Sequence, residues 1–345
     1  MRAPGLLAGR FEGDKVRFLI IGCGSMGKRR ARVLKRLGFN DILAFDMRSD
    51  RLDEIRAKSG VQTFDNLEGA LIAEPDVLMV CVPPHLHVQY MREGLRSNKH
   101  LFVEAPTALL EKELDEVIGL AANSDRVVAP SFTYFCHPHH VKVKELVDSE
   151  VIGKPIALVI HSGLHVADWH PYEDYRQFYA SDRDKGGACI DVLVHELHLA
   201  RWLVGEVSTV TCNARKRSSA EIKGFDIYDL LIDSEDGASV VIHNDVVQRP
   251  WGLYRKIMGE QGAIVWDWQK LEVFTTENGA WEKTVQPENA DFDDMYVAEI
   301  DHFLGVVRGE KQLLHTLEDE KRILQTMLAA EESSLTGTRK QMSFQ

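Results

Sequence analysis

A glycine-rich turn between a buried-type strand and a helix constrains the fold of this chain more than any other stretch. Residues 16–21 form an unbroken run of strand-forming side chains, and residues 22–27 read Gly-Cys-Gly-Ser-Met-Gly. Helical periodicity follows as far as Gly38, and a second apolar run, residues 42–45, ends at Asp46. This order of strand, GxGxxG turn, helix, strand and acidic residue predicts a dinucleotide-binding unit.

The residues of this turn each suit a bound dinucleotide. Gly22 permits the tight turn, Gly24 lets the backbone approach a pyrophosphate, and Gly27 lets the helix pack closely against the strand. The N–H groups that open the helix, at Ser25 and Met26, and the helix dipole favour the charge of a phosphate. The basic cluster of residues 28–30, Lys-Arg-Arg, lies next to this presumed pyrophosphate site.

The cofactor expected at this turn is NAD. Asp46 lies about twenty residues beyond the last glycine, where a carboxylate accepts hydrogen bonds from the ribose hydroxyls of adenosine. A carboxylate repels the 2′-phosphate of NADP. Arg48 and Arg51 follow closely and would tolerate that phosphate, so NAD is the prediction and NADP is the alternative.

The order of the predicted elements divides the chain into two domains. Strands alternate with helices as far as residue 129, which predicts a parallel, doubly wound sheet with its ligand outside the carboxyl ends of the strands. Beyond about residue 150, strands follow one another with turns such as Asp236-Gly237 between them. We therefore expect an α/β Rossmann domain over residues 1–132. An α+β domain over residues 133–345, with a large, open and mostly antiparallel sheet, would bind substrate and another subunit.

Composition excludes several other classes of protein. The net charge of −12 argues against a nucleic-acid binder. The 5 cysteines are odd in number and form no CxxC pair, which suits a reducing cytoplasm better than a disulfide framework. No apolar run has the length of a membrane span, and the first fifteen residues do not read as a signal peptide. We expect a cytoplasmic protein with no membrane partner.

Four stretches in sequence order resemble the glucose-fructose oxidoreductase / inositol dehydrogenase / MocA family. They are the glycine turn with Asp46, then Val-Pro-Pro-His-Leu-His at 82–87, then Phe-Val-Glu-Ala-Pro at 102–106, and Gly-Gly-Ala-Cys-Ile-Asp-Val-Leu-Val-His at 186–195. The last three are similar to the family's Thr-Pro-Asn-x-x-His, Glu-Lys-Pro and Gly-Gly-Gly-x-x-x-Asp-x-x-x-His motifs. The resemblance implies an NAD(P)-dependent dehydrogenase or reductase that acts on CH–OH groups.

The second and third stretches imply further contacts with the cofactor. The residues concerned are Val82, Pro83, His87, Glu104, Ala105 and Pro106. By resemblance, His87 lies near the cofactor and Glu104 binds the nicotinamide ribose. The family's usual catalytic lysine is Ala105 in this chain, which puts the ordinary mechanism in question and leaves the fold assignment intact.

The fourth stretch supplies the predicted catalytic pair. Asp191 and His195 are four residues apart, so they share one face of a helix. By resemblance this face looks onto the nicotinamide, where His195 would transfer the proton of the substrate hydroxyl and Asp191 would bind or orient the substrate. A plain ion pair on a helix surface is the alternative. Lys185, just before the glycines, is a further candidate in place of the missing lysine, although most lysines there are solvated.

Two clusters of histidines also invite a metal interpretation. Asp191, His195 and His198 could form a site of two histidines and a carboxylate, but the histidines lack the spacing of HExxH. Residues 136–140 match no common zinc pattern. We therefore expect no metal and assign these histidines to structure or to the polar lining of the substrate site.

A long polar and aromatic loop, residues 164–176, is the predicted substrate-binding segment. Aromatic faces stack on sugar rings, while carboxylates and guanidinium groups bind hydroxyls or an anionic substituent. A subunit-contact loop is the alternative. The residues expected to contact substrate are His165, Asp168, Trp169, His170, Tyr175 and Arg176.

The leading hypothesis is hydride transfer between NAD and a hydroxyl or ketone carbon of a sugar, cyclitol or nucleotide-linked sugar. A glycosidase that uses NAD transiently is one alternative. A non-catalytic sensor of NAD and sugar is another, which Ala105 favours and which the retained Asp191 and His195 disfavour. We expect a homodimer or homotetramer formed through the second domain's sheet.

Overall fold

The chain folds into two units in a computed structural model that describes residues 16–284 and 291–344. The first unit comprises residues 16–136 and 291–321, and the second comprises residues 137–284 and 322–344. The prediction about a signal peptide concerns residues 1–15 and lies outside the described residues.

The first unit contains a six-stranded sheet in the order β3-β2-β1-β4-β5-β6, and its strand pairs are all parallel. The strands are β1 (Phe18–Ile21), β2 (Ile42–Phe45), β3 (Gln62–Phe64), β4 (Val77–Val80), β5 (His100–Val103) and β6 (Val128–Pro130). The helices between them are α1 (Ser25–Arg36), α2 (Ser49–Ser59), α3 (Leu67–Ile72), α4 (His87–Arg96) and α5 (Glu111–Ala122). The predicted doubly wound parallel sheet is confirmed.

Burial on both faces explains why the central strands of this sheet are continuous apolar runs. Every residue of β1, β2 and β4 is buried, as expected for a parallel sheet covered by helices on both sides. In the observed register, Ile21 lies opposite both Phe45 and Val80. The carboxyl ends of β1, β2 and β4 therefore meet at one edge, which is the edge where ligands of such sheets bind.

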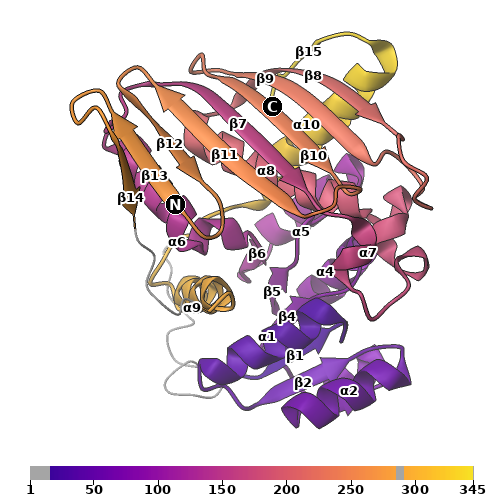
Figure 1. Ribbon diagram of the computed structural model, residues 1–345. Helices are drawn as coiled ribbons and strands as arrows, with labels where there is room; N and C mark the ends of the chain where they lie inside the picture. The colour runs from indigo at the N-terminus through magenta and orange to yellow at the C-terminus, as the bar shows by residue number, and fades with distance from the viewer. Residues whose placement is uncertain (1–15, 285–290, 345) are drawn as a thin grey trace. The chain divides into compact units, whose positions relative to one another are not determined.

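A helix from far along the chain completes the first unit. α9 (Asp294–Val307) lies beside α1 (Figure 1) and contributes Ile300 and Phe303 to the hydrophobic core. The Phe303 ring packs edge-on against Phe102, with 5.3 Å between ring centroids. The predicted boundary after residue 132 placed this helix in the second domain. Its apolar face instead packs within the first unit, because the chain returns to that unit after residue 290. A single boundary along the sequence cannot describe such a return.

The second unit contains a nine-stranded sheet in the order β14-β13-β12-β11-β7-β10-β9-β8-β15 (Figure 1). Its strands are β7 (Pro155–Gly163), β8 (Val207–Arg215), β9 (Ile227–Ser234), β10 (Ser239–Asp245), β11 (Gly252–Gly259), β12 (Gly262–Trp266), β13 (Leu271–Thr275), β14 (Trp281–Thr284) and β15 (Lys340–Gln341). Neighbouring strands are antiparallel except for β7 and β10, which are parallel. The prediction of a large, mostly antiparallel sheet is confirmed.

The helices of the second unit include α6 (Pro138–Asp148), α8 (Ala188–Val204) and the part of α10 (Leu317–Thr336) that follows residue 321. α8 packs against β7, β9 and β10. α10 is joined to β8 by two serines, because Ser333 Oγ accepts a hydrogen bond from the Cys212 N–H and Ser334 Oγ accepts one from the Ala214 N–H.

Local hydrogen bonds determine where β10 ends. Its last residue is Asp245, whose carboxylate accepts hydrogen bonds from the N–H groups of Val247 and Gln248 and turns the chain. The predicted loop contains a short helix, α7 (Val166–Trp169). Within residues 16–284 and 291–344, we find no helix with the length and apolar character needed to cross a membrane.

Candidate active site

The glycine turn has the geometry that a bound dinucleotide requires. Gly22 has a φ of +94°, and a Cβ atom on it would lie 2.7 Å from the carbonyl oxygen of Cys81. A Cβ atom on Gly27 would lie 1.9 Å from the carbonyl oxygen of Gly22. Beside Gly24, by contrast, the nearest atom is the end of the flexible Arg51 side chain, 3.6 Å from a Cβ position. Protein backbone therefore leaves no room for a side chain at Gly22 or Gly27, whereas only a flexible side chain borders Gly24. A phosphate of NAD can approach the backbone at Gly24, so these residues fit NAD.

Asp46 lies directly against this turn. Its Oδ2 accepts a hydrogen bond from the Cys23 N–H at 2.8 Å, and its Oδ1 accepts one from the Arg48 N–H at 2.9 Å. Burial, with the Asp46 charge as a smaller cause, raises the pKa of the Cys23 thiol to about 12. Arg51 Nη1 lies 4.0 Å from Asp46 Oδ2, whereas the Arg48 guanidinium pairs with exposed Asp50. Arg48 thus contacts Asp46 through its backbone, and Arg51 places its guanidinium beside the Asp46 carboxylate.

The turns after β4 and β5 are tied together by a buried histidine. His87 is fully buried, and its ring nitrogens lie 2.7 Å from the carbonyl oxygen of Val82 and 2.9 Å from that of Pro106. Burial lowers the pKa of this imidazole, although both carbonyl contacts oppose that shift. His87 thus links the turn after β4 to the turn after β5 through its two ring nitrogens. Direct contact between His87 and the cofactor stays a prediction.

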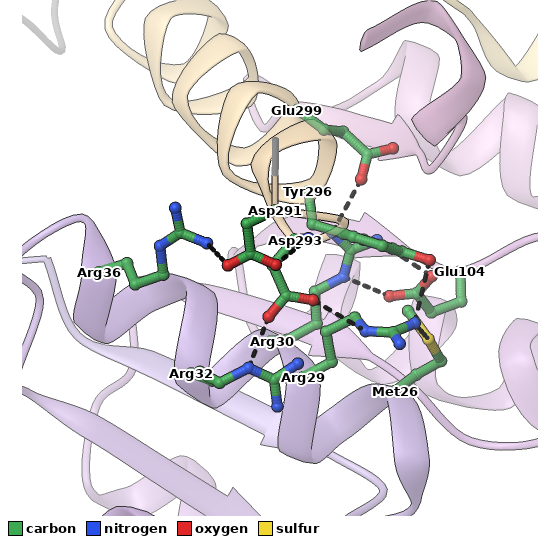
Figure 2. A network of polar contacts seen from close by, with 10 residues as sticks. All are labelled: Met26, Arg29, Arg30, Arg32, Arg36, Glu104, Asp291, Asp293, Tyr296 and Glu299. Atoms are coloured by element: carbon green, nitrogen blue, oxygen red, sulfur yellow. Dashed lines mark hydrogen bonds and ion pairs between the residues drawn. The ribbon is translucent and has the colours of Figure 1, made fainter. Parts of the chain in front are cut away.

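Glu104 sits at the end of β5 in a buried network of charges (Figure 2). The Glu104 carboxylate accepts hydrogen bonds from Arg30 Nε at 2.6 Å and Arg30 Nη2 at 3.1 Å. The Arg30 side chain is 0% exposed and also donates from Nη1 to Glu299, on α9. Arg30 is therefore buried within the unit, and the expectation that residues 28–30 lie beside the pyrophosphate stays a prediction. The neighbouring Lys28 pairs with Glu54, on α2.

The predicted catalytic pair lies on one half-buried face of α8. Gly187 precedes the helix, with a φ of +67° that favours glycine. Asp191 and His195 follow on the first turns, and Tyr179 Oη donates a hydrogen bond to Asp191 Oδ2 at 2.9 Å. His198, which continues the sequence pattern, is buried. Sequence reasoning missed Tyr179, and its position in the aromatic-rich segment before the glycines was the only signal.

The remaining catalytic candidate is a surface residue. The Lys185 side chain is 52% exposed, and its Nζ lies 3.6 Å from Asp182 Oδ2. Ala105, where the family carries its lysine, is partly exposed at the end of β5. A catalytic role of Lys185 stays a prediction.

The polar side chains of the predicted substrate loop mostly bind one another or nearby segments. His165 caps α7 by accepting a hydrogen bond from the Ala167 N–H, and Asp168 binds Arg249 through both carboxylate oxygens. His170 contacts Tyr172 Oη, and Arg176 pairs with Asp174 and Glu221. Tyr175 Oη accepts from the Glu221 N–H, and Trp169 is half-buried. These contacts stabilise the conformation of the loop. Substrate contacts by the same residues stay predictions.

The parallel sheet, the glycine turn and the Asp46 carboxylate beside it are the features of an NAD-binding domain. Comparison with known proteins agrees with that class. Residues 16–132 match the family described as "Oxidoreductase family, NAD-binding Rossmann fold", and residues 140–265 match the "GFO/IDH/MocA C-terminal domain". The chain belongs to the Gfo/Idh/MocA family of NAD-binding oxidoreductases.

Named relatives and solved structures extend over most of the chain. It is 30% identical to the myo-inositol 2-dehydrogenase of Thermotoga maritima over 194 residues, which are 55% of each chain. It is 21% identical to the scyllo-inositol 2-dehydrogenase (NAD(+)) of Bacillus subtilis, over 94% of this chain and 95% of the relative. A levoglucosan dehydrogenase solved with NADH and L-sorbose shares the fold, with a TM-score of 0.85, 16% identity, and coverage of 96% of this chain and 99% of that one.

Proposed function

We propose that this oxidoreductase acts on a ring hydroxyl, or the corresponding ketone, of a sugar, cyclitol or nucleotide-linked sugar. The observation that carries the proposal is the arrangement of Asp191 and His195 on one face of α8, with Asp191 held by Tyr179. Bound NAD supplies a carbon that accepts hydride. The chain itself must then move a proton and hold a polyhydroxylated ring.

We assign the proton transfer to His195 and the binding of substrate hydroxyls to Asp191. An imidazole has a pKa near neutrality and can take the hydroxyl proton in oxidation or return it in reduction. The Tyr179 hydrogen bond holds Asp191 Oδ2 at 2.9 Å and so fixes the orientation of the carboxylate that we assign to the substrate. The residues that would hold NAD are Gly22, Gly24, Ser25, Met26, Gly27, Asp46 and Glu104.

The names of the relatives support a cyclitol or sugar substrate. Two of them act on inositols, and one solved structure with the same fold contains L-sorbose. The aromatic and charged loop around Trp169 and Arg176 has the chemistry to bind such rings.

The test is formation of reduced nicotinamide during incubation with NAD and a panel of cyclitols and sugars. We expect turnover with at least one of them, and we expect His195→Ala to lower kcat roughly a hundredfold to ten-thousandfold while NAD still binds. His302→Gln is the matched control, because its ring contacts the Gln312 carbonyl in the first unit. Tight NAD binding without turnover of any compound would overturn the proposal, and equal turnover by His195→Ala would remove His195 from it.

We further propose that the partner of the second unit's sheet is another copy of this chain. Leu231 and Val241 lie opposite each other on β9 and β10 and are 60% and 41% exposed. Tyr254, on β11, is also exposed. An antiparallel sheet with exposed apolar residues on its outer face is suited to self-association. Light scattering should give the mass of a dimer or tetramer, and the mass of a single chain would refute this assignment.

A further inference from the structure

Arg30 occupies a position from which it controls the orientation of Glu104. Its guanidinium meets the Glu104 carboxylate in a two-point contact, through Nε at 2.6 Å and Nη2 at 3.1 Å. Such a paired contact fixes the plane of the carboxylate as well as its position, which a lysine ammonium does not do. The Glu104 side chain is 12% exposed, so the fully buried Arg30 holds it from the interior while part of it remains accessible.

The surroundings of Arg30 leave it no other orientation. The guanidinium lies close to two aromatic rings, with its central carbon 4.6 Å from the Phe102 centroid and 5.1 Å from the Tyr296 centroid. Nη2 also donates to Ser131 Oγ at 3.0 Å, and Nη1 donates to Glu299 Oε2 at 2.8 Å. Figure 2 shows Arg30, on α1, together with Glu104 and with Tyr296 and Glu299 of α9.

The charges of this network favour a pair between Arg30 and Glu104. One buried guanidinium faces two carboxyl groups, and burial raises the pKa of Glu299, although Arg30 opposes that shift. Glu299 accepts hydrogen bonds from Arg30 Nη1 at 2.8 Å and from Ser131 Oγ at 2.9 Å. Burial thus disfavours the charged form of Glu299, whereas Glu104, whose side chain is 12% exposed, meets Arg30 in the two-point contact.

The same contacts show that Arg30 cannot replace the family's catalytic lysine, whose position is occupied by Ala105 in this chain. A guanidinium that is 0% exposed and bonded to three side chains cannot reach a substrate. Its influence on a ligand must pass through Glu104, the partly exposed member of the network.

We propose that Arg30 is a positioning residue of the NAD site, which fixes the Glu104 carboxylate in the orientation that binds the nicotinamide ribose. This inference rests on the proposed role of Glu104. It adds that cofactor binding depends on a residue of α1 that cannot touch the cofactor, and on α9, which holds Arg30 through Glu299.

The experiment compares the dissociation constants of NAD and of ADP, which lacks the nicotinamide ribose. Losing a hydrogen bond to a charged group corresponds to roughly a 10- to 100-fold loss of affinity. We expect Arg30→Lys and Glu104→Gln each to weaken NAD by about that factor and to leave ADP binding within about twofold. Arg32→Lys is the matched control, because its 53% exposed side chain pairs with Asp293 and not with Glu104.

A double-mutant cycle separates positioning from general damage. If Arg30 acts through Glu104, the variant carrying both changes should bind NAD no more weakly than Glu104→Gln alone. Additive losses, or equal losses of NAD and ADP in a folded Arg30→Lys protein, would overturn the proposal. Ser131→Ala, which removes one Arg30 acceptor, is the second variant should Arg30→Lys fail to fold; it should weaken NAD binding and spare ADP, and unchanged NAD binding would count against the proposal. These readouts need no turnover, so a failed substrate screen leaves them valid, whereas absence of NAD binding by the unaltered chain would refute the cofactor site itself.

Discussion

Each unit of this protein buries an arginine completely, and the two arginines are used differently. Arg30, in the first unit, binds Glu104, whose side chain is 12% exposed at the candidate cofactor edge. Arg255, on β11 of the second unit, binds Glu196, on α8, and both side chains are 0% exposed. Each guanidinium also lies near an aromatic ring, Phe102 for Arg30 and Trp268 for Arg255. We propose that an arginine–glutamate pair orients a ligand contact where the glutamate is partly exposed, whereas the fully buried pair of the second unit contributes to stability.

The largest effect that would test this contrast is expected at Arg255. Removing one partner of a fully buried ion pair leaves the other charge uncompensated, so Arg255→Met or Glu196→Gln should lower the free energy of unfolding by about 3–5 kcal/mol. The double variant Arg255→Met/Glu196→Leu should recover much of that loss. Denaturant unfolding measures both.

The contrast also requires a difference in ligand binding. Arg255→Met that still folds should keep the NAD affinity of the unaltered chain, whereas Arg30→Lys should not. Lys142→Ala provides a control in the second unit, because its pair with Glu145 is exposed and should change stability by less than about 1 kcal/mol. A loss of NAD affinity at Arg255 as large as that at Arg30 would break the comparison.

A smaller effect is expected at Glu299, the second carboxyl group that Arg30 contacts. The pKa of Glu299 is raised by burial above its ordinary value of 4.5. A raised carboxyl pKa contributes stability that is present below the ordinary value and is lost as pH rises through the folded-state value. Glu299→Gln stays neutral at every pH, so its stability relative to the unaltered chain should increase as pH rises. If the difference in free energy of unfolding between the two proteins stayed constant across the acid-to-neutral range, this assignment would be contradicted.

The parts of the fold and site that sequence could predict are those encoded locally. The glycine turn, Asp46 and the strand before them follow from residue types within about thirty positions, as expected for a βαβ unit. The face shared by Asp191 and His195 follows from helical spacing alone. These features need no knowledge of distant segments.

The parts that sequence could not predict depend on contacts between distant segments. Arg30 is 269 residues from Glu299, and nothing in its local sequence distinguishes it from a solvated or phosphate-binding arginine. The return of α9 to the first unit and the Tyr179 bond to Asp191 are similar cases, because tertiary packing decides them. The resemblance likewise predicted that His87 lies near the cofactor, whereas its contacts with the Val82 and Pro106 carbonyl oxygens could be seen only in the structure.

The central claim, hydride transfer from a CH–OH carbon, is tested most directly by following deuterium from the substrate to the cofactor. The chain would be incubated with NAD and a panel of cyclitols and sugars that carry deuterium on the ring carbons, and the cofactor would be analysed by mass spectrometry. The account predicts reduced nicotinamide that contains substrate deuterium, in amounts that fall sharply with His195→Ala. Release of a cleaved glycoside with NAD left oxidised, or cofactor that never acquires deuterium from any compound, would contradict it.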